Sequence, residues 1–326
     1  MKKILALLLV TALAVGAFAG CKKEPEAPAA PEPIRILAIG NRQALDGMQL
    51  LFEVFQAEQP ERQVVLGVLD GEDYRLDQHK AAAEEAGIDY SYYKNVSGHW
   101  EVSIECSMDD ALKDDAWDVV VLQELNTVAG KANTFNDDDL SYLSSYIKSR
   151  TGDSVRLYWQ FVWSNPEIPA DTATEDMWMF RDTRQQTAQM WCEFYEKTYQ
   201  NDSGVMFDAM AANVQTYVLD GGLGFEGVIP TATVIQHLKN VSKVEDSYLY
   251  RDYACLSDAG RLAAAYVWYA RLCGLEEIGA VSVAEIPAAL RHYSFAEEGD
   301  LLLEERYREQ VKAAVNYALQ NPLTRP

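Results

Sequence analysis

The sequence predicts an α/β protein in which helices cover both faces of a parallel central sheet. Short apolar runs alternate along the chain with longer segments whose apolar residues recur at helical spacing. One run, residues 117–123, is almost continuously apolar, as a central parallel strand must be when both of its faces are covered. Because crossovers between parallel strands are right-handed, such a chain folds into three layers, and ligands bind at the carboxyl ends of the strands.

In the first half of the chain, residues 34–39 form a β-rich apolar run, and residues 44–56 follow with apolar side chains at helical spacing. Residues 63–69 repeat the strand pattern, and residues 74–86 form a predicted polar helix. Residues 90–104 alternate aromatic and polar side chains around a Gly-containing turn, which predicts a β-hairpin outside the main sheet.

In the second half, residues 137–147 form a predicted helix whose acidic start suits the positive end of the helix dipole. Ser257 is the expected N-cap of an alanine-rich helix at 256–272, and Gly274 stands just past its end. The remaining predicted elements are strands at 155–162 and 204–207 (a short edge strand), a long helix at 178–199, a helix at 232–239 into which residues 227–230 lead, and a helical tail at 286–319.

The amino-terminal segment is typical of an exported bacterial lipoprotein. Lys2 and Lys3 precede an apolar stretch that is too short to span a bilayer comfortably, and small residues then lead directly to Cys21. We expect cleavage before Cys21, lipid attachment to that cysteine and a location in the cell envelope, on the outer membrane or cell surface rather than in the cytoplasm. The predicted order is a signal peptide at 1–20, an extended Pro/Glu/Ala-rich tether at 21–33 and one domain at 34–326.

Composition narrows the range of partners. The chain has 28 Lys and Arg against 50 Asp and Glu, and a formal net charge of −22 repels nucleic acid, so we expect no nucleic-acid partner. Apart from Cys21, the four cysteines are irregularly spaced without a Cys-x-x-Cys pair, and no two of the four histidines have metal-ligand spacing. We therefore expect neither a metal nor a cofactor, and the membrane, through Cys21, is the expected partner.

Two segments resemble the SGNH (GDSL-like) hydrolases. The first predicted strand ends in Gly40-Asn41-Arg42, where the family has Gly-Asn-Ser, and Asp252 to Cys255 resembles its last motif, an Asp followed three residues later by a His. The resemblance covers nearly the whole chain from Ile34 and is closest to a branch of bacterial lipoproteins described as DUF4886-like. It implies a three-layer α/β/α, flavodoxin-like SGNH-hydrolase fold with a parallel central sheet, and it implies ester hydrolysis as the ancestral activity.

The residues that this chemistry requires are mostly replaced. The family uses a serine nucleophile, a histidine base and an aspartate that orients the histidine. Asp252 fills the aspartate position, but Arg42 stands in place of the serine and Cys255 in place of the histidine. Arginine has no lone pair to attack a carbonyl, and a thiol is poorly matched to the role of the base. Where the family offers glycines for the oxyanion hole, the chain has Glu72-Asp73-Tyr74-Arg75.

Two of these residues have competing interpretations. Arg42 either pairs with Asp252 across the former active site, which would otherwise hold an unpartnered carboxylate, or points into solvent. Cys255 is either a small buried apolar side chain at the start of a helix, which we favour, or a reactive thiol.

The leading hypothesis is a pseudoenzyme that is held to the membrane and binds a ligand such as a glycan. The alternative is an active esterase or carbohydrate deacetylase that uses relocated residues, for example Cys255 or Ser257 assisted by His79, with an acyl-ester ligand. A third possibility is a purely structural envelope protein. Aromatic and amide side chains near the predicted strand ends are the ligand-binding candidates: Asn41, Tyr74, Gln123, Asn126 and Trp163.

Overall fold

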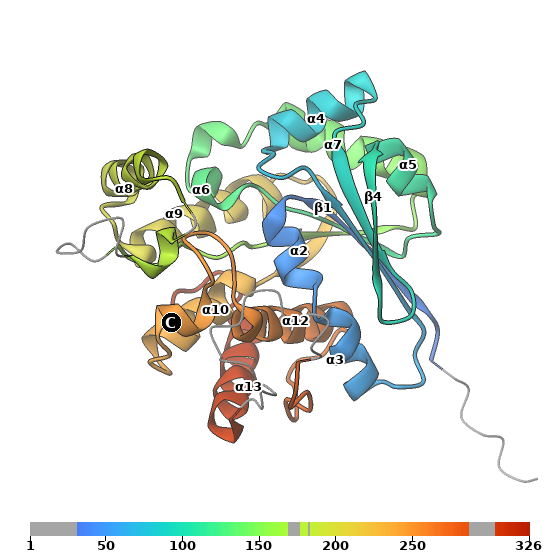
Figure 1. Ribbon diagram of the computed structural model, residues 1–326. Coiled ribbons are helices and arrows are strands. Elements are labelled where there is room, and N and C mark those ends of the chain that lie inside the picture. The colour runs from blue at the N-terminus through green and yellow to red at the C-terminus, as the bar shows by residue number, and fades with distance from the viewer. Residues whose placement is uncertain (1–30, 169–176, 182, 287–303) are drawn as a thin grey trace, which may run out of the picture. The chain divides into compact units, whose positions relative to one another are not determined.

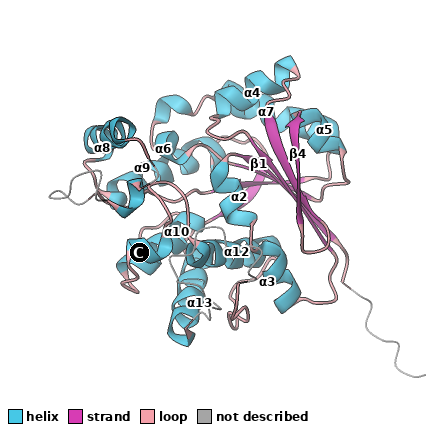
Figure 2. Cartoon of the chain, viewed as in Figure 1, coloured by secondary structure: helices cyan, strands magenta, loops and turns pink. Residues whose placement is uncertain are grey.

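Seven strands form one sheet in the order β4-β3-β2-β1-β5-β6-β7 (Figures 1 and 2). The computed structural model describes residues 31–168, 177–181, 183–286 and 304–326. The predicted signal peptide, Cys21, most of the tether and the first part of the predicted tail helix lie outside the described residues. The strands are β1 Ile34–Gly40, β2 Val64–Asp70, β3 Tyr90–Asn95, β4 Trp100–Cys106, β5 Val119–Leu122, β6 Arg156–Gln160 and β7 Phe225–Ile229.

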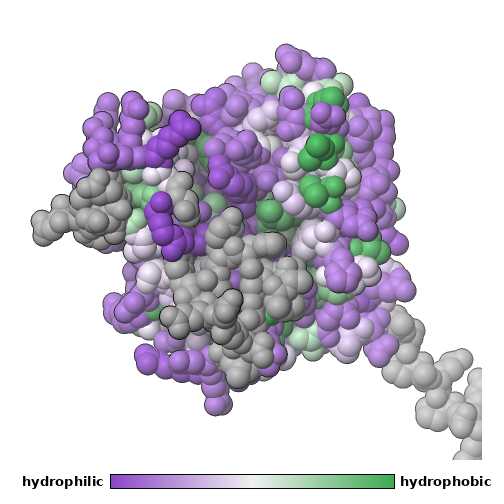
Figure 3. Space-filling model, viewed as in Figure 1, coloured by the Kyte–Doolittle hydropathy of each residue, from purple (hydrophilic) through white to green (hydrophobic). Residues whose placement is uncertain are grey.

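Five strands, from β2 to β7 across the sheet, are parallel, which confirms the predicted parallel core. The predicted position of the hairpin is wrong. Strand β3 pairs antiparallel with β2, and β4 pairs antiparallel with β3, so the hairpin extends the main sheet. The reason is that Tyr90 and Tyr92 of β3 are buried against the sheet's core, whereas the edge strand β4 is largely exposed. Figure 3 shows apolar surface over this edge on a mostly hydrophilic face, and it includes Val102 and Ile104.

Two helical layers cover the sheet, which confirms the three-layer α/β/α arrangement (Figure 1). Alternate residues of each strand point to opposite layers, as the pleat requires. One layer contains α2 Arg42–Met48, α3 Leu51–Glu58, α10 Thr231–Asn240, α12 Asp258–Leu272 and α13 Glu305–Gln320. The other contains α4 Leu76–Glu85, α5 Met108–Lys113, α7 Asp137–Thr151, α8 Gln185–Tyr199 and α9 Ser203–Asn213.

Short helical segments complete the described chain. They are α6 Asn126–Ala129, η1 Ala132–Thr134, η3 Trp178–Phe180, η4 Val214–Leu219 and α11 Asp246–Leu249. No helix among the described residues is long and apolar enough to cross a membrane.

Local sequence signals explain several of the element boundaries. Ser257 caps α12 as predicted, because its hydroxyl accepts a hydrogen bond from the Gly260 amide, and Gly274 follows the helix in a left-handed conformation. The predicted helix at 44–56 is broken into α2 and α3, and the carbonyl of Gln49 at the break accepts the indole N–H of Trp100. Gly47 allows α2 to lie close to the sheet, since a Cβ there would approach the side chain of Gln160 to 2.8 Å.

Two further predictions are corrected. The predicted edge strand at 204–207 lies in helix α9, because the Asp202 carboxylate caps that helix by accepting the amides of Gly204 and Val205. The predicted helix at 178–199 is divided into the short η3 and the longer α8.

Candidate functional site

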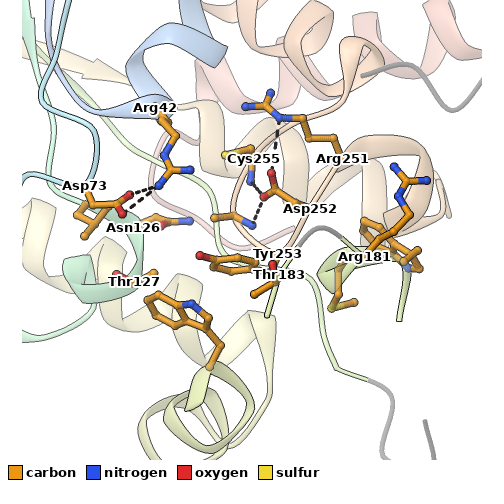
Figure 4. Close-up of a pocket in the computed structure, with 15 residues that line it drawn as sticks. Arg42, Asp73, Asn126, Thr127, Arg181, Thr183, Arg251, Asp252, Tyr253 and Cys255 are labelled. Atoms are coloured by element: carbon orange, nitrogen blue, oxygen red, sulfur yellow. Dashed lines mark hydrogen bonds and ion pairs between the residues drawn. The ribbon is translucent and has the colours of Figure 1, made fainter. Parts of the chain in front are cut away.

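A cavity of about 380 Å³ opens at the carboxyl edge of the sheet (Figure 4). Its lining comes from the segments that follow β1, β2 and β5, from residues 178–181, Thr183 and α8, and from the loop 251–255 that precedes α12. This is the edge at which open parallel sheets bind ligands. The three degenerate triad positions, Arg42, Asp252 and Cys255, all line this cavity, although they come from distant parts of the sequence.

The loop 251–255 is closed by its own aspartate. Oδ1 of Asp252 accepts hydrogen bonds from the amides of Ala254 and Cys255, both at 2.8 Å, and Oδ2 lies 3.6 Å from Nε of Arg251. An antiparallel bridge between Tyr250 and Leu256 joins the two ends of the loop. The carboxylate that would orient a catalytic histidine therefore holds backbone amides instead.

Cys255 is a buried thiol. The residue is 3% exposed, and burial, together with the carboxylates of Asp46 and Asp252, raises the pKa of its thiol well above the ordinary value. Such a thiol is protonated at neutral pH and is a poor nucleophile and a poor base. The structure agrees with the interpretation of Cys255 as a small buried side chain.

Arg42 pairs with an acidic residue that we did not predict as its partner. Its Nη2 lies 2.9 Å and 3.0 Å from the two carboxylate oxygens of Asp73 and 4.0 Å from Glu72. Of the two interpretations of Arg42, the structure contradicts the ion pair with Asp252, because Asp252 already accepts two amides and because Asp73 follows β2, the direct neighbour of β1. Figure 4 shows the Arg42–Asp73 pair at one side of the cavity.

A buried ionic cluster fixes the loop to α2. Oδ1 of Asp46 lies 2.6 Å from Nη1 of Arg251 and 2.8 Å from Nη2 of Arg261, and Oδ2 accepts the amide of Leu256 at 2.8 Å. Burial alone would raise the pKa of Asp46, but the two guanidinium groups lower it. Asp258 at the start of α12 pairs with Arg261 as well. The cluster therefore holds Asp252 and Cys255 at the cavity wall.

Asn126 alone among the predicted ligand-binding candidates lines the described part of the cavity. Asn41 caps α2, and its Oδ1 accepts the amide of Gln43 and the side-chain amide of Gln123, the latter at 2.6 Å. Asn41 and Gln123 are almost fully buried and lie behind the cavity wall. Their positions indicate a scaffolding role at the end of β1.

The two aromatic candidates also support the site from outside it. Trp163 is fully buried and donates its indole N–H to the carbonyl of Ala254 at 2.8 Å, so it holds the loop from behind. Tyr74 packs edge-to-face on His79 and Tyr90 rather than on the cavity. Neither side chain lines the cavity.

The structure does not bring together the relocated catalytic residues that we considered. Within the described chain, no histidine lines the cavity. His79 is fully buried against Tyr90, its Nδ1 lies 2.9 Å from the phenol oxygen, and burial lowers its pKa to about 3. Ser257 donates its hydroxyl hydrogen to the carbonyl of Tyr248 and caps α12. Of the proposed set, Cys255 alone reaches the cavity.

Several cavity residues escaped the sequence prediction: Thr127, Met179, Arg181, Thr183, Trp191, Arg251 and Tyr253. Arg251 and Tyr253 flank Asp252 in the recognised motif, and this adjacency is the signal that could have found them. Trp191 on α8 has no such signal, because its position depends on how α8 packs. Across residues that the structure describes, no group of three or more His, Cys, Asp or Glu side chains could hold a metal ion.

The fold and the site define a three-layer α/β protein with its cleft at the carboxyl ends of parallel strands. A family model described as "Domain of unknown function (DUF4886)" matches residues 35–278, so the chain belongs to the DUF4886 family. This confirms the family assignment that the sequence motifs suggested. No curated protein matches the chain.

A solved structure of another member of this family has a similar fold. A crystal structure of a DUF4886 family protein from Bacteroides uniformis matches with a TM-score of 0.69 at 20% identity and covers 90% of this chain and 97% of that chain. A putative SGNH hydrolase from Slackia heliotrinireducens matches with a TM-score of 0.40 at 18% identity, over 72% and 97% of the chains. A putative GDSL-like lipase from Parabacteroides merdae matches with a TM-score of 0.41 at 14% identity, over 76% and 99%.

Proposed function

We propose that this protein is an exported lipoprotein that is anchored to a membrane of the cell envelope. We further propose that its cavity binds a glycan without hydrolysing an ester. One observation carries the proposal. At the carboxyl edge of the sheet, where SGNH-like hydrolases present a serine and a histidine, this chain presents Arg42 tied to Asp73 and the buried Cys255.

The proposal of an inactive site rests on the lack of a nucleophile and a base in the described lining of the cavity. Ester hydrolysis needs these two groups in contact with each other. Arg42 is a cation without a lone pair, and the pKa of the Cys255 thiol is raised by burial. The carboxylates of Glu72 and Asp73 lie beside Arg42, where a developing oxyanion would need hydrogen-bond donors. The competing proposal, an active esterase or carbohydrate deacetylase, requires a nucleophile–base pair that the described lining does not supply.

The lining suits a neutral sugar. Trp178, Trp191 and Tyr253 contribute aromatic surface, on which the C–H faces of a sugar ring can pack. Asp252 and Thr127 supply hydrogen-bonding oxygens, and Arg42 supplies N–H donors. Because carboxylates and guanidinium groups both line the cavity, the hydroxyl groups of a sugar find hydrogen-bond acceptors as well as donors there.

The position of the cavity fits the proposed anchor. The tether joins the domain at the amino end of β1, and Arg42 follows the carboxyl end of the same seven-residue strand. At roughly 3.3 Å per residue, β1 separates these two points by about 20 Å. A lipid on Cys21 would therefore leave the cavity at the opposite end of the sheet from the point of attachment.

Isothermal titration of the full chain with neutral oligosaccharides tests the proposal. Tyr253 stacks on Phe180 and lies close to Trp191 at the cavity, so Tyr253→Ala should weaken binding about tenfold, which corresponds to ~1.4 kcal/mol. Tyr248→Ala removes a tyrosine that does not line the cavity and should leave the affinity unchanged. The absence of binding to any neutral oligosaccharide, or equal effects of the two substitutions, would contradict a glycan site in this cavity.

A further inference from the structure

The orientation of the Asn126 amide is fixed by a chain of carbonyl acceptors. The side-chain amide of Asn165 donates to the carbonyl of Tyr253 at 2.5 Å and also contacts the hydroxyl of Tyr195. Because a carbonyl can only accept, this bond determines that Nδ2 of Asn165 faces Tyr253 and that its Oδ1 faces Asn126. Nδ2 of Asn126 must then donate to that oxygen, at 2.8 Å, and it also approaches the carbonyl of Trp163 at 3.5 Å.

The oxygen of the same amide has no partner. Asn126 is fully buried and lines the cavity, and its Oδ1 makes no hydrogen bond with any described residue. A buried acceptor that is cut off from water and left without a donor is costly to the folded state. A ligand that brings an N–H or O–H group to this oxygen removes that cost.

The polarity of this amide is the opposite of what an ester hydrolase needs. An oxyanion hole presents N–H donors to a negative oxygen. Both hydrogen-bonding directions of Nδ2 are used by Asn165 and Trp163, so the amide has only its acceptor left for the cavity. Asn126 therefore favours a ligand that donates a hydrogen bond to its Oδ1.

A complementary donor lines the same cavity. Every hydrogen bond that Arg42 makes to described side chains uses Nη2, on Asp73, which leaves Nε and Nη1 for an acceptor on a ligand. Apolar surface is also present, from Leu125, Met179 and Ala254. The cavity thus combines an isolated acceptor, a cationic donor and apolar contacts (Figure 4).

We infer that the cavity selects an N-acetylated amino sugar, an inference that rests on the glycan-binding function proposed above. The acetamido group carries an N–H for Oδ1 of Asn126, a carbonyl oxygen for Arg42 and a methyl group for the apolar wall. A plain hydroxyl group would satisfy Asn126 but would leave the apolar wall without a contact. The Arg42 side chain is 42% exposed, so its guanidinium group is accessible to a ligand in the cavity.

Titration of the full chain with matched trisaccharides tests this inference. Chitotriose, here the trimer of N-acetylglucosamine, differs from cellotriose only in carrying an acetamido group instead of a hydroxyl group at each C2 position. We expect chitotriose to bind at least about tenfold more tightly. Fully deacetylated chitotriose, which lacks the carbonyl and the methyl group, should lose that advantage. These three ligands test the inference on the unmodified chain, without any variant that might fail to fold.

A pair of variants assigns the preference to Asn126. Asn126→Ala should reduce the ratio of the two affinities to about one. Asn213→Ala is the matched control, because Asn213 is also buried and donates to a backbone carbonyl, that of Ala129, but does not line the cavity. It should keep the full preference.

The outcomes separate the two proposals. Equal binding of cellotriose and chitotriose would overturn the inference and leave glycan binding intact. The absence of binding to all three trisaccharides would overturn the glycan-binding function and the inference with it. Tighter binding of trialanine than of chitotriose would show that the cavity recognises a peptide amide, and this result would also contradict the inference.

Discussion

Single side chains decide what this cavity can do. The motif resemblance placed Arg42, Asp252 and Cys255 at one site, and the structure brings all three to the same cavity. The partner of Arg42 could not be predicted in the same way, because Asp73 is reached only through the pairing of β1 with β2. The direction of the Asn126 amide was equally out of reach, since it depends on Asn165 and on the backbone carbonyl of Tyr253.

Glu124, which directly follows Gln123, provides a pH prediction at the residue scale. Burial raises the pKa of its carboxyl from 4.5 to about 8, and the charge of Asp77 adds to the increase. Hydrogen bonds from the amides of Leu125 and Leu76 and the charge of Arg75 lower the pKa but do not outweigh burial. Below pH 4.5 both the folded and the unfolded chain hold this proton, so the group does not make the stability depend on pH there. Between pH 4.5 and about 8 only the folded chain keeps it, so stability falls as pH rises, by at most ~1.4 kcal/mol per pH unit.

Glu124→Gln removes this titration. The free energy of unfolding of the variant relative to the unmodified chain, measured by urea denaturation, should therefore increase from pH 5 to pH 8 and then stay constant. Burial also raises the pKa of Asp70 to about 6 and that of Glu53 to about 7, but both groups remain in both proteins and cancel in the difference. A difference that does not vary with pH would show that Glu124 ionises normally in the folded chain.

At the scale of elements, periodicity and capping signals predicted what forms locally, and packing decided the rest. The cap at Ser257 and the strand at 155–162, observed as β6, follow from short-range rules. The segment after Asp202 is a predicted edge strand at 204–207, although an aspartate cap before a run of small and apolar residues predicts a helix instead. The break between α2 and α3 involves Trp100, about fifty residues away.

The ionic cluster between α2, α12 and the cavity loop gives the element-scale prediction. Asp46→Asn leaves the buried guanidinium groups of Arg251 and Arg261 without their shared countercharge. Loss of one partner of a buried ion pair typically costs 3–5 kcal/mol, so urea denaturation should show a destabilisation of about that size. Asp109→Asn is the control, because Asp109 pairs with the more exposed Lys113 and Arg150 and its loss should cost about 1 kcal/mol or less. Similar losses in both variants would argue against a cluster that secures the loop.

At the scale of the whole molecule, alternating strands and helices predicted a parallel sheet between two helical layers, and this prediction is confirmed. The hairpin was misplaced because its edge strand carries few buried residues, so its sequence resembles a surface excursion. Strand order is a property of long-range pairing that periodicity does not encode. The resemblance to a known family supplied the location of the cleft, whereas the positions of Trp191, of residues 178–181 and of Thr183 depend on tertiary packing.

The proposed anchor is tested by the distribution of the protein between membrane and soluble fractions. Cys21→Ala removes the only thiol that a lipoprotein signal would modify, and the acidic chain has no charge-based attraction to anionic lipid. The unmodified protein should sediment with membranes, and the variant should not. Equal membrane association of both proteins would contradict lipidation at Cys21.

The most direct test of the central claim is the initial rate of 4-nitrophenyl acetate hydrolysis by the full chain and by Asp252→Asn. This substitution keeps an oxygen that can accept the amides of Ala254 and Cys255 and removes only the charge that a triad would need. A binding protein without a working triad should give the same low rate with either residue. A rate for the unmodified chain that exceeds that of Asp252→Asn by about 100-fold or more would contradict the account and establish an active hydrolase.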